Sequence, residues 1–348
     1  MSEPINRKHF LKSVAGAGAG MTLASGYAYA GVSEAGQSAR VSPIGEPARV
    51  GIIGLDTSHS PAFTRLINRD DNGASTGFRV TAAYPYGSRT IESVYNNIPR
   101  YTEQVKGMGV EIVDSIQDLV SQVDFVLLET NDGKPRLEQA IEVMEAGKIM
   151  YMDKPVAGSL KDAVEIVKVA ERLGAPVYTC SSLRYMKEAQ QVRHNNAIGD
   201  VTGADAFSPA SLEPSHPDLF WYGIHGVETL FTVMETGCHS VTRTQTEGTE
   251  LVVGTWEDDR IGTFRGTRAG RSGYGGIAYG TDGIMHMTTF EGYGPMIVKV
   301  LEYFRSGVSP VAVDEMLEIY AFMEAADESK RRNGAPVTLA EVLSEAGA

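Results

Sequence analysis

A lysine that follows a short apolar segment and precedes a proline is the first residue of this sequence that could take part in chemistry. Residues Lys148–Met152 are predicted to form a buried strand, and Asp153, Lys154 and Pro155 follow it. The residue before a proline avoids helical geometry, so Lys154 is expected to be extended at the C-terminal end of that strand. Ligands bind at this edge of open α/β sheets, where a lysine can stabilise the charge on a hydroxyl that loses its proton. For these three residues alone, a surface lysine in an ordinary loop is the simpler interpretation, and the neighbouring sequence is what favours chemistry.

Strands alternate with helices along the first half of the chain. Strands are predicted at residues 49–55, 78–84, 110–113, 124–129, 148–152 and 176–179, and helices at 60–68, 115–121, 135–146 and 159–173. This alternation predicts a parallel sheet with helices on both faces. A nucleotide pocket is then expected beyond the C-terminal ends of the first strands.

The pattern changes in the second half, where strands follow one another without helices between them. Strands are predicted at 199–210, 241–248, 251–256, 261–267 and 277–289, helices at 221–234 and 314–332, and a glycine- and arginine-rich loop that contains Tyr274 at 266–280. We therefore predict an α/β chain with two domains. An N-terminal Rossmann-like parallel sheet spans residues 47–178, and a C-terminal α+β domain with a large open, mainly antiparallel sheet and a returning helix spans 179–348.

Several motifs, taken in order and spacing, resemble the Gfo/Idh/MocA family of NAD(P)-dependent oxidoreductases. They are Val50–Leu55, Val123–Val126 continuing through Thr130–Gly133, Glu145–Lys148, Asp153-Lys154-Pro155 in place of the family's Glu-Lys-Pro, Ser182–Tyr185, Gly223–Glu228 and Ala325–Ser329. The similarity covers roughly residues 49–339. It implies NAD or NADP as the cofactor, a sugar-like or polyol substrate, and a C-terminal sheet that forms a homo-oligomer.

The resemblance also implies which residues contact the dinucleotide. They are Gly51, Gly54, Asp56, Thr57, Ser58, His59, Ser88, Arg89, Thr130, Asn131, Asp153 and Lys154. Asp56 and His59 stand where the family has the second and third glycines of its fingerprint. An aspartate there brings a side chain and a negative charge close to the pyrophosphate. By residue type alone, however, Asp56, Thr57 and Ser58 are ordinary helix N-cap candidates.

A second departure follows the second strand, where the acidic residue that would hold the ribose is missing. Residues 84–89 stand there instead, and Ser88 with Arg89 would suit the 2′-phosphate of NADP, although a lone arginine usually faces solvent. Two interpretations remain open: the dinucleotide binds in an altered pose, or this branch of the family has lost it.

The resemblance places the proton acceptor at His225, beside Lys154. A histidine suits this task because its unperturbed pKa of about 6.5 lets it accept and return a proton near neutrality. The family's acidic residue four positions earlier is Trp221 here, and Glu228 lies one helical turn after His225, where it could orient the ring. The remaining substrate-contact candidates are Arg184, Tyr185, Trp221, Tyr222 and Glu228.

The chain begins with a segment that resembles a twin-arginine export signal. A basic stretch from Arg7 to Lys12, a weakly apolar glycine- and alanine-rich run and the small-x-small pattern Ala28-Tyr29-Ala30 occur in order, although Lys8 replaces the second arginine. We expect residues 1–30 to be a leader for the periplasm and residues 31–46 to be a linker. The run is too short and too glycine-rich to anchor the protein in a membrane.

The net charge and the number of cysteines limit the kinds of partner and of covalent cross-link to be expected. The net charge of the whole chain is −13, and it becomes about −15 without the leader, which carries +2. This charge disfavours nucleic acid and anionic membranes as partners. Cys180 and Cys238 are the only cysteines, which is too few for a disulfide framework, so we expect buried thiols.

The leading hypothesis is therefore an exported oxidoreductase that moves hydride between a sugar-like carbinol and a tightly held NAD or NADP, with no metal. An alternative is a non-redox lyase or hydrolase acting on sugar derivatives. Polar groups for such a site, with or without a metal, are Asp56, His59, His216, Asp218, His225, Glu228 and His239. A carbohydrate-binding relative without turnover is a third class, and the retention of Lys154 and His225 argues against it.

Overall fold

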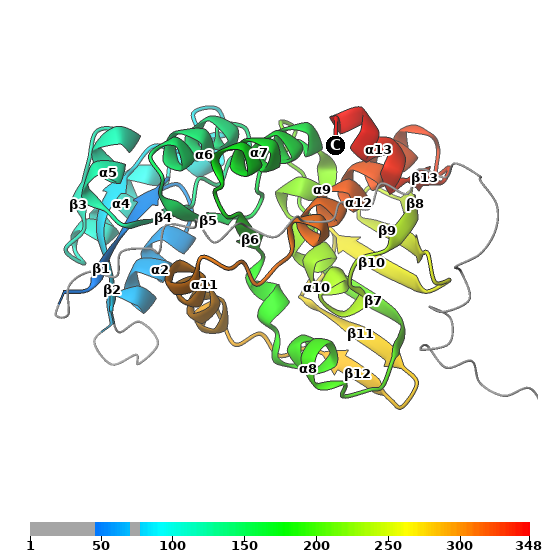
Figure 1. Ribbon diagram of the computed structural model, residues 1–348. Coiled ribbons are helices and arrows are strands. Elements are labelled where there is room, and N and C mark those ends of the chain that lie inside the picture. The colour runs from blue at the N-terminus through cyan, green and yellow to red at the C-terminus, as the bar shows by residue number, and fades with distance from the viewer. Residues whose placement is uncertain (1–45, 70–76) are drawn as a thin grey trace, which may run out of the picture. The chain divides into compact units, whose positions relative to one another are not determined.

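The computed structural model describes residues 46–69 and 77–348, in which two β-sheets lie beside one another with helices packed on them (Figure 1). The expected leader, and the linker apart from its last residue, lie outside the described residues. Among the residues that are described, no helix is both long and apolar enough to span a membrane.

The first sheet is six-stranded and parallel, with strand order β3-β2-β1-β4-β5-β6. Its strands are β1 (Ala48–Ile53), β2 (Phe78–Tyr84), β3 (Glu111–Ile112), β4 (Phe125–Leu128), β5 (Ile149–Asp153) and β6 (Tyr178–Cys180). This is the order of a dinucleotide-binding fold, and its direction reverses between β1 and β4. Ligands bind outside the carboxyl ends of the strands at such a reversal.

Helices cover both faces of this sheet, as the alternating pattern predicts. They are α2 (His59–Ile67), α3 (Glu92–Tyr95), α4 (Ile98–Lys106), α5 (Ile116–Gln122), α6 (Arg136–Glu145), α7 (Leu160–Leu173) and, from late in the chain, α11 (Gly294–Ser306). Helices α5, α6 and α7 lie on one side, and α2 and α11 lie on the other (Figure 1).

Local sequence explains where these elements begin and how closely they pack. The hydroxyls of Ser115 and Ser159 accept hydrogen bonds from the backbone N–H groups three residues later and so begin α5 and α7. Gly174 ends α7 in the left-handed conformation. A Cβ at Gly51 would lie 2.9 Å from Leu119, so this glycine lets α5 pack directly on β1.

The second sheet is seven-stranded, with order β12-β11-β7-β10-β9-β8-β13. Its strands are β7 (Val201–Pro209), β8 (Cys238–Gln245), β9 (Thr249–Trp256), β10 (Ile261–Thr267), β11 (Gly275–Gly280), β12 (Ile284–Met287) and β13 (Val337–Thr338). Only β7 and β10 pair in parallel, so the predicted open and mainly antiparallel sheet is confirmed.

The remaining helices pack on this sheet or join it to the first one. They are η1 (Ser182–Tyr185), α8 (Lys187–Asn195), α9 (Asp218–Trp221), α10 (Ile224–Met234), α12 (Val313–Arg331) and α13 (Leu339–Ala346). Every residue of α10 is buried, because the helix lies between the sheet, α8 and α12. Helix α12 contacts β8, α7 and β6, and therefore ties the two halves together.

Several predicted elements were wrong in detail. The predicted helix 221–234 is broken at Tyr222 and Gly223 into α9 and α10, and the predicted strand 277–289 is the hairpin of β11 and β12. The predicted loop 266–280 includes β11, because glycines at 275 and 276 fit the close approach of β7 and β12: a Cβ at Gly276 would lie 2.5 Å from the carbonyl oxygen of Asp205. Both cysteines are buried free thiols, as expected.

Candidate active site

A cavity of about 350 Å³ lies where the two halves of the described chain meet. The first half contributes residues that follow the carboxyl ends of β1, β4, β5 and β6, together with residues of α3 and α4, and the second half contributes residues near α10, β11 and α11. The lining consists of Asp56, Thr57, Ser58, His59, Ser93, Val94, Asn97, Tyr101, Asn131, Lys154, Ser182, Leu183, Tyr222, His225, Tyr274, Phe290 and Tyr293. Lys154 and His225, which were predicted to share one site, therefore face the same cavity.

Lys154 follows the last residue of β5 and is 6% exposed. No hydrogen bond or ion pair joins its Nζ to another described residue, although Asp153 and Glu129 lie near enough for its charge to act on their carboxyl groups. A buried ammonium group without a fixed partner has three donors available for a ligand in the cavity.

His225 lies in the first turn of α10, where Ser181 fixes the orientation of its ring. Ser181 Oγ is 2.7 Å from His225 Nδ1 and also accepts the N–H of Leu183. In the tautomer whose Nδ1–H donates to Ser181, the ring presents a bare Nε2 that can accept a proton. Burial lowers the pKa of His225 well below its usual value, and the nearby Lys154 and His59 lower it further. The ring is therefore neutral at pH 7, as a proton acceptor must be.

A second histidine on the cavity wall pairs with a buried carboxylate. His59 begins α2, and its Nδ1 lies 2.6 Å from Oδ2 of Asp153, the last residue of β5. The rings of Phe63 and Tyr293 pack against the imidazole with centroids 5.1 and 4.8 Å away. Burial raises the pKa of Asp153, but His59 and Lys154 outweigh burial, and the net pKa is lowered, so this group is an ionised carboxylate. Both residues of this pair were predicted to contact the cofactor, but nothing local in the sequence indicates that they meet.

Glu129 lies behind this pair and was not singled out in the sequence. It follows β4, is fully buried, and has no hydrogen-bond partner among the described residues for either carboxyl oxygen. Burial and the neighbouring Asp153 raise its pKa well above the usual value, which favours the neutral form of Glu129. Its only sequence signal is an acid that directly follows the apolar stretch at residues 125–128.

The turn after β1 combines a glycine that the fold requires with an unusual aspartate. Gly54 has φ +89°, and a Cβ there would lie 2.6 Å from the backbone of Thr130. The carboxylate of Asp56 accepts hydrogen bonds from the backbone N–H groups of Ser88 (2.7 Å) and Asn131 (3.0 Å) and so joins the loops after β2 and β4. Burial raises the pKa of Asp56. Its side chain thus bridges the loops and does not cap a helix.

Of the other residues predicted to bind cofactor, Asn131 lines the cavity and Ser88, Arg89 and Thr130 do not. Ser88 is fully buried, and its Oγ donates to Asp132 Oδ2 at 2.8 Å. Arg89 is exposed and stacks over Tyr86, with its guanidinium carbon 4.3 Å from the ring centroid. Neither residue lines the cavity. Thr130 is buried, while Asn131 does line the cavity.

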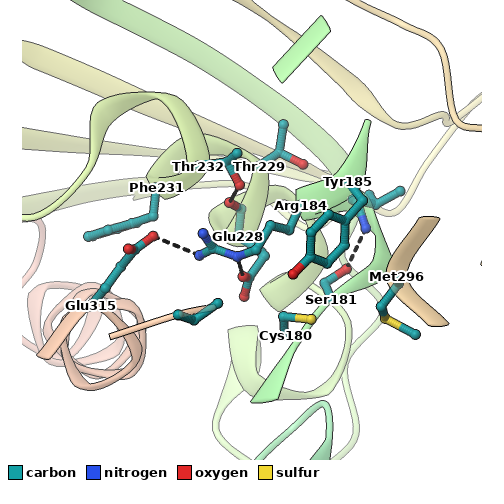
Figure 2. Close-up of polar contacts among 12 residues, drawn as sticks. Cys180, Ser181, Arg184, Tyr185, Glu228, Thr229, Phe231, Thr232, Met296 and Glu315 are labelled. Carbon is teal, nitrogen blue, oxygen red and sulfur yellow. Dashed lines mark hydrogen bonds and ion pairs between the residues drawn. The ribbon is translucent and has the colours of Figure 1, made fainter. Parts of the chain in front are cut away.

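Arg184 and Glu228, two predicted substrate contacts, lie in a buried ion-pair network outside the cavity lining. Figure 2 shows the guanidinium of Arg184 between the carboxylates of Glu228 and Glu315. Arg184 Nη2 is 2.8 Å from Glu315, whose other oxygen is 2.7 Å from Arg193. Glu228 is thus paired with Arg184, and Ser181 is the side chain that orients His225. The network connects η1, α8, α10 and α12.

Of the aromatic residues predicted to contact substrate, Tyr222 lines the cavity, whereas Tyr185 and Trp221 do not. The hydroxyl of Tyr185 is 2.7 Å from that of Tyr178, in the interior of the protein, and Trp221 packs against the ring of His216 outside the cavity lining. Tyr222 does line the cavity, and its hydroxyl is 3.0 Å from that of Tyr274. Tyr274 belongs to the segment that was predicted to be a loop near substrate.

The polar residues considered for a metal-dependent site do not gather at one place. His216 pairs with Asp132 and the N–H of Gly133, Asp218 pairs with Arg243 and Lys330, and His239 is exposed. Within the described parts of the chain, one group of three possible ligands lies close together: His59, Glu129 and Asp153, with atoms within 4.8 Å of one another. Two cations, Arg136 and Lys154, act on its carboxyl groups. Their charges offset those of the carboxylates and oppose a buried metal cation.

Comparisons with known proteins agree with this architecture. Residues 48–180 match the GFO_IDH_MocA family, described as "Oxidoreductase family, NAD-binding Rossmann fold". No curated protein matches the chain by sequence.

Several solved structures have the same fold, and this chain covers nearly the whole length of each. A putative myo-inositol dehydrogenase from Sinorhizobium meliloti 1021 has a TM-score of 0.70 at 14% identity, over 84% of this chain and 99% of that one. Scyllo-inositol dehydrogenase from Lactobacillus casei with bound NAD(H) and scyllo-inositol has a TM-score of 0.67 at 14% identity, over 85% and 100%. GenD2 from gentamicin A biosynthesis in complex with NAD has a TM-score of 0.68 at 15% identity, over 86% and 98%. The N-terminal half of the chain thus matches an oxidoreductase family with an NAD-binding Rossmann fold, and the whole described chain shares the fold of these dehydrogenase structures.

Proposed function

We propose that this protein is an NAD(P)-dependent oxidoreductase that acts on a CH–OH group of a sugar-like or polyol substrate. One observation carries the proposal: Lys154 from the nucleotide-binding half and His225 from the sheet half line the same cavity at the carboxyl edge of the parallel sheet. A putative myo-inositol dehydrogenase and a scyllo-inositol dehydrogenase that holds NAD(H) and scyllo-inositol share this fold, which supports a polyol substrate.

The residues around the turn after β1 fit a dinucleotide in most respects. Gly54 allows the turn to pass close to the loop after β4, and residues 56–59, which lead into the N-terminus of α2, line the cavity, so a phosphate there would lie at the positive end of a helix. Asn131 and Lys154 line the cavity beyond them. Asp56 is the exception, because a negative charge in this turn would repel phosphate. Burial raises the pKa of Asp56 and so favours its neutral form, which does not repel phosphate.

The division of work between Lys154 and His225 follows from their charges and partners. A nicotinamide ring, when bound, supplies the hydride acceptor or donor. The ammonium group of Lys154 donates a hydrogen bond to the substrate oxygen and stabilises the negative charge that develops there. His225 is kept neutral by burial, and Nε2 takes the hydroxyl proton while Ser181 holds the ring. In the reverse direction, His225 returns the proton to the alkoxide.

The wall of the cavity suits a polyhydroxylated ring. Tyr222, Tyr274, Phe290 and Tyr293 supply aromatic surface for the C–H face of a sugar, and three of them carry hydroxyl groups. Burial raises the pKa of Tyr293 to about 12, so this phenol stays protonated and can donate a hydrogen bond.

We also propose that the protein is exported, holds its cofactor tightly and forms a homo-oligomer through the second sheet. The leader supports export, and a protein working outside the cytoplasm would need to retain a dinucleotide loaded before export. Alternation along β10 places Ile261 on the face opposite α10, and this side chain is 55% exposed. Exposed apolar side chains on an open sheet favour association with a second copy.

The experiment is to purify the protein from the exported fraction, denature it and measure the released nicotinamide dinucleotide by mass spectrometry. A stoichiometric amount, or binding of added NAD or NADP measured by calorimetry, supports the proposal. Turnover is then followed at 340 nm with a panel of inositols and sugars. If no dinucleotide is released and the protein binds neither added NAD nor added NADP, the redox assignment is overturned. Size-exclusion chromatography with light scattering tests the oligomer.

A further inference from the structure

The cavity contains a histidine–carboxylate pair, His59 with Asp153, that simple alcohol oxidation does not need. Oxidation of a CH–OH group needs one base for the hydroxyl proton, and His225 already has that position in the cavity. His59 is a second imidazole in the lining of the same cavity, contributed by the other half of the chain, and its charge acts on His225.

The geometry of His59 is that of a histidine prepared for proton transfer. Asp153 Oδ2 accepts the Nδ1–H at 2.6 Å, which fixes the tautomer and leaves Nε2 without a hydrogen-bond partner among the described residues. The carboxylate is 1% exposed, so it stabilises positive charge on the ring without competition from water. Phe63 and Tyr293 confine the ring from two sides, which prevents it from rotating away.

Lys154 connects this pair to the carbonyl chemistry of the proposed function. The residue adjoins Asp153 in sequence, lines the cavity with His59, and donates to the substrate oxygen. An ammonium group that stabilises an alkoxide also stabilises an enolate at the same oxygen. The cavity thus holds an oxyanion stabiliser and two separately held imidazoles.

We propose that His59 is a second catalytic acid–base residue, positioned by Asp153, which removes and returns the proton on the carbon next to the ketone formed by oxidation. Nε2 of His59 takes the C–H proton, the C–H electron pair becomes the C=C bond, and the carbonyl π pair becomes the negative charge on the oxygen beside Lys154. Return of the proton to the same carbon regenerates the ketone, so no oxidant or other reactant is consumed. The inference rests on the proposed function, since its substrate class is the keto form of a sugar-like ring.

The test supplies the ketone directly and therefore needs no cofactor turnover. A panel of monoketones of cyclic polyols and keto-sugars is incubated with the protein in D₂O without added dinucleotide, and loss of the neighbouring C–H signal is followed by proton NMR. We expect the wild type to accelerate exchange and His59→Gln to reduce the enzyme-dependent rate by roughly 100-fold or more. Exchange no faster than in protein-free solution with every ketone would overturn the proposal.

Asp153→Asn separates positioning from folding. Without the carboxylate the Nδ1–H of His59 is no longer held in place, so the exchange rate should fall while the protein keeps its fold and its binding of the ketone, a separation that a purely structural role would not produce. The other titratable groups around His59 remain unchanged in this variant: His225, Lys154, Tyr293 and Glu129. The matched control is Glu129→Gln, because Glu129 lies behind the His59–Asp153 pair and outside the cavity lining, and glutamine has nearly the same shape.

The control should retain wild-type exchange and the hydrogen-bonded ring N–H signal of His59 in the free protein, whereas Asp153→Asn should lose that signal. Equal loss of exchange in Glu129→Gln and His59→Gln would overturn the proposal, as would wild-type exchange in His59→Gln. A protein that exchanges ketone protons but binds no dinucleotide would contradict the redox proposal alone, so the two failures are distinguishable.

Discussion

Replacing Lys154 by methionine removes the ammonium group and keeps most of the apolar stem. The residue is 6% exposed, so water does not replace the lost charge fully. An ammonium about 4 Å from a developing alkoxide, at an effective dielectric constant of about 20, contributes about 4 kcal/mol. Since each 1.36 kcal/mol changes the rate about tenfold, kcat/KM should fall by roughly 10³-fold.

The assay is the rate of dinucleotide reduction at 340 nm with whichever polyol the wild type oxidises. Lys161→Met is the matched control, because Lys161 is an exposed residue of α7 in the same half of the chain and should retain full activity. Circular dichroism and thermal melting of both variants establish that the fold is intact. A folded Lys154→Met variant with more than a tenth of wild-type kcat/KM would refute the electrostatic reasoning.

Further predictions concern the proton acceptor, the turn and the buried groups. His225→Asn should lower kcat by ~100-fold or more with little change in KM, and a kcat within twofold of wild type would contradict the assignment. Asp56→Gly should tighten NAD binding in calorimetry by about tenfold, because a carboxyl group leaves the phosphate region; unchanged affinity would show that the dinucleotide avoids this turn. Arg184→Met leaves Glu228 without its cation in the interior and Glu315 with Arg193 alone, and should cost about 3–5 kcal/mol in denaturant unfolding, whereas a loss below about 1 kcal/mol would argue against the buried network. The folded-state pKa of Glu129 is raised above the unfolded value of 4.5, so its contribution to stability is present below pH 4.5 and lost as the pH rises. Glu129→Gln should therefore gain stability relative to wild type between pH 4.5 and neutrality, and a constant difference across that range would contradict the buried neutral acid.

The two halves of the candidate site are held by different kinds of interaction. Lys154 and Asp153 depend on the end of a buried strand in the parallel sheet. His225 depends on α10, whose position is fixed by packing on the second sheet and by the Arg184–Glu228 pair that joins it to η1. Loss of that pair should therefore disturb His225 through the backbone and leave Lys154 in place.

The sequence by itself determined the alternation of strands and helices, the carboxyl edge of the first sheet and the position of Lys154 on it. These features depend on residues close together in the chain: apolar runs of strand length, serine caps at 115 and 159, and a proline after the lysine. It also indicated His225, through the order and spacing of motifs that resemble the family.

Only the tertiary structure decided which polar side chains meet. His59 and Asp153 are 94 positions apart, and no local pattern pairs them. The first turn of α2 follows β1, and the carboxyl ends of β1 and β5 lie at the same edge of the parallel sheet, on either side of β4. Glu228 is one helical turn from His225, yet it pairs with Arg184, because a buried carboxylate is stabilised more by a guanidinium than by a neutral ring. Spacing along the chain limits which residues share a face, but the partner of a buried charge depends on all the groups that folding brings within reach.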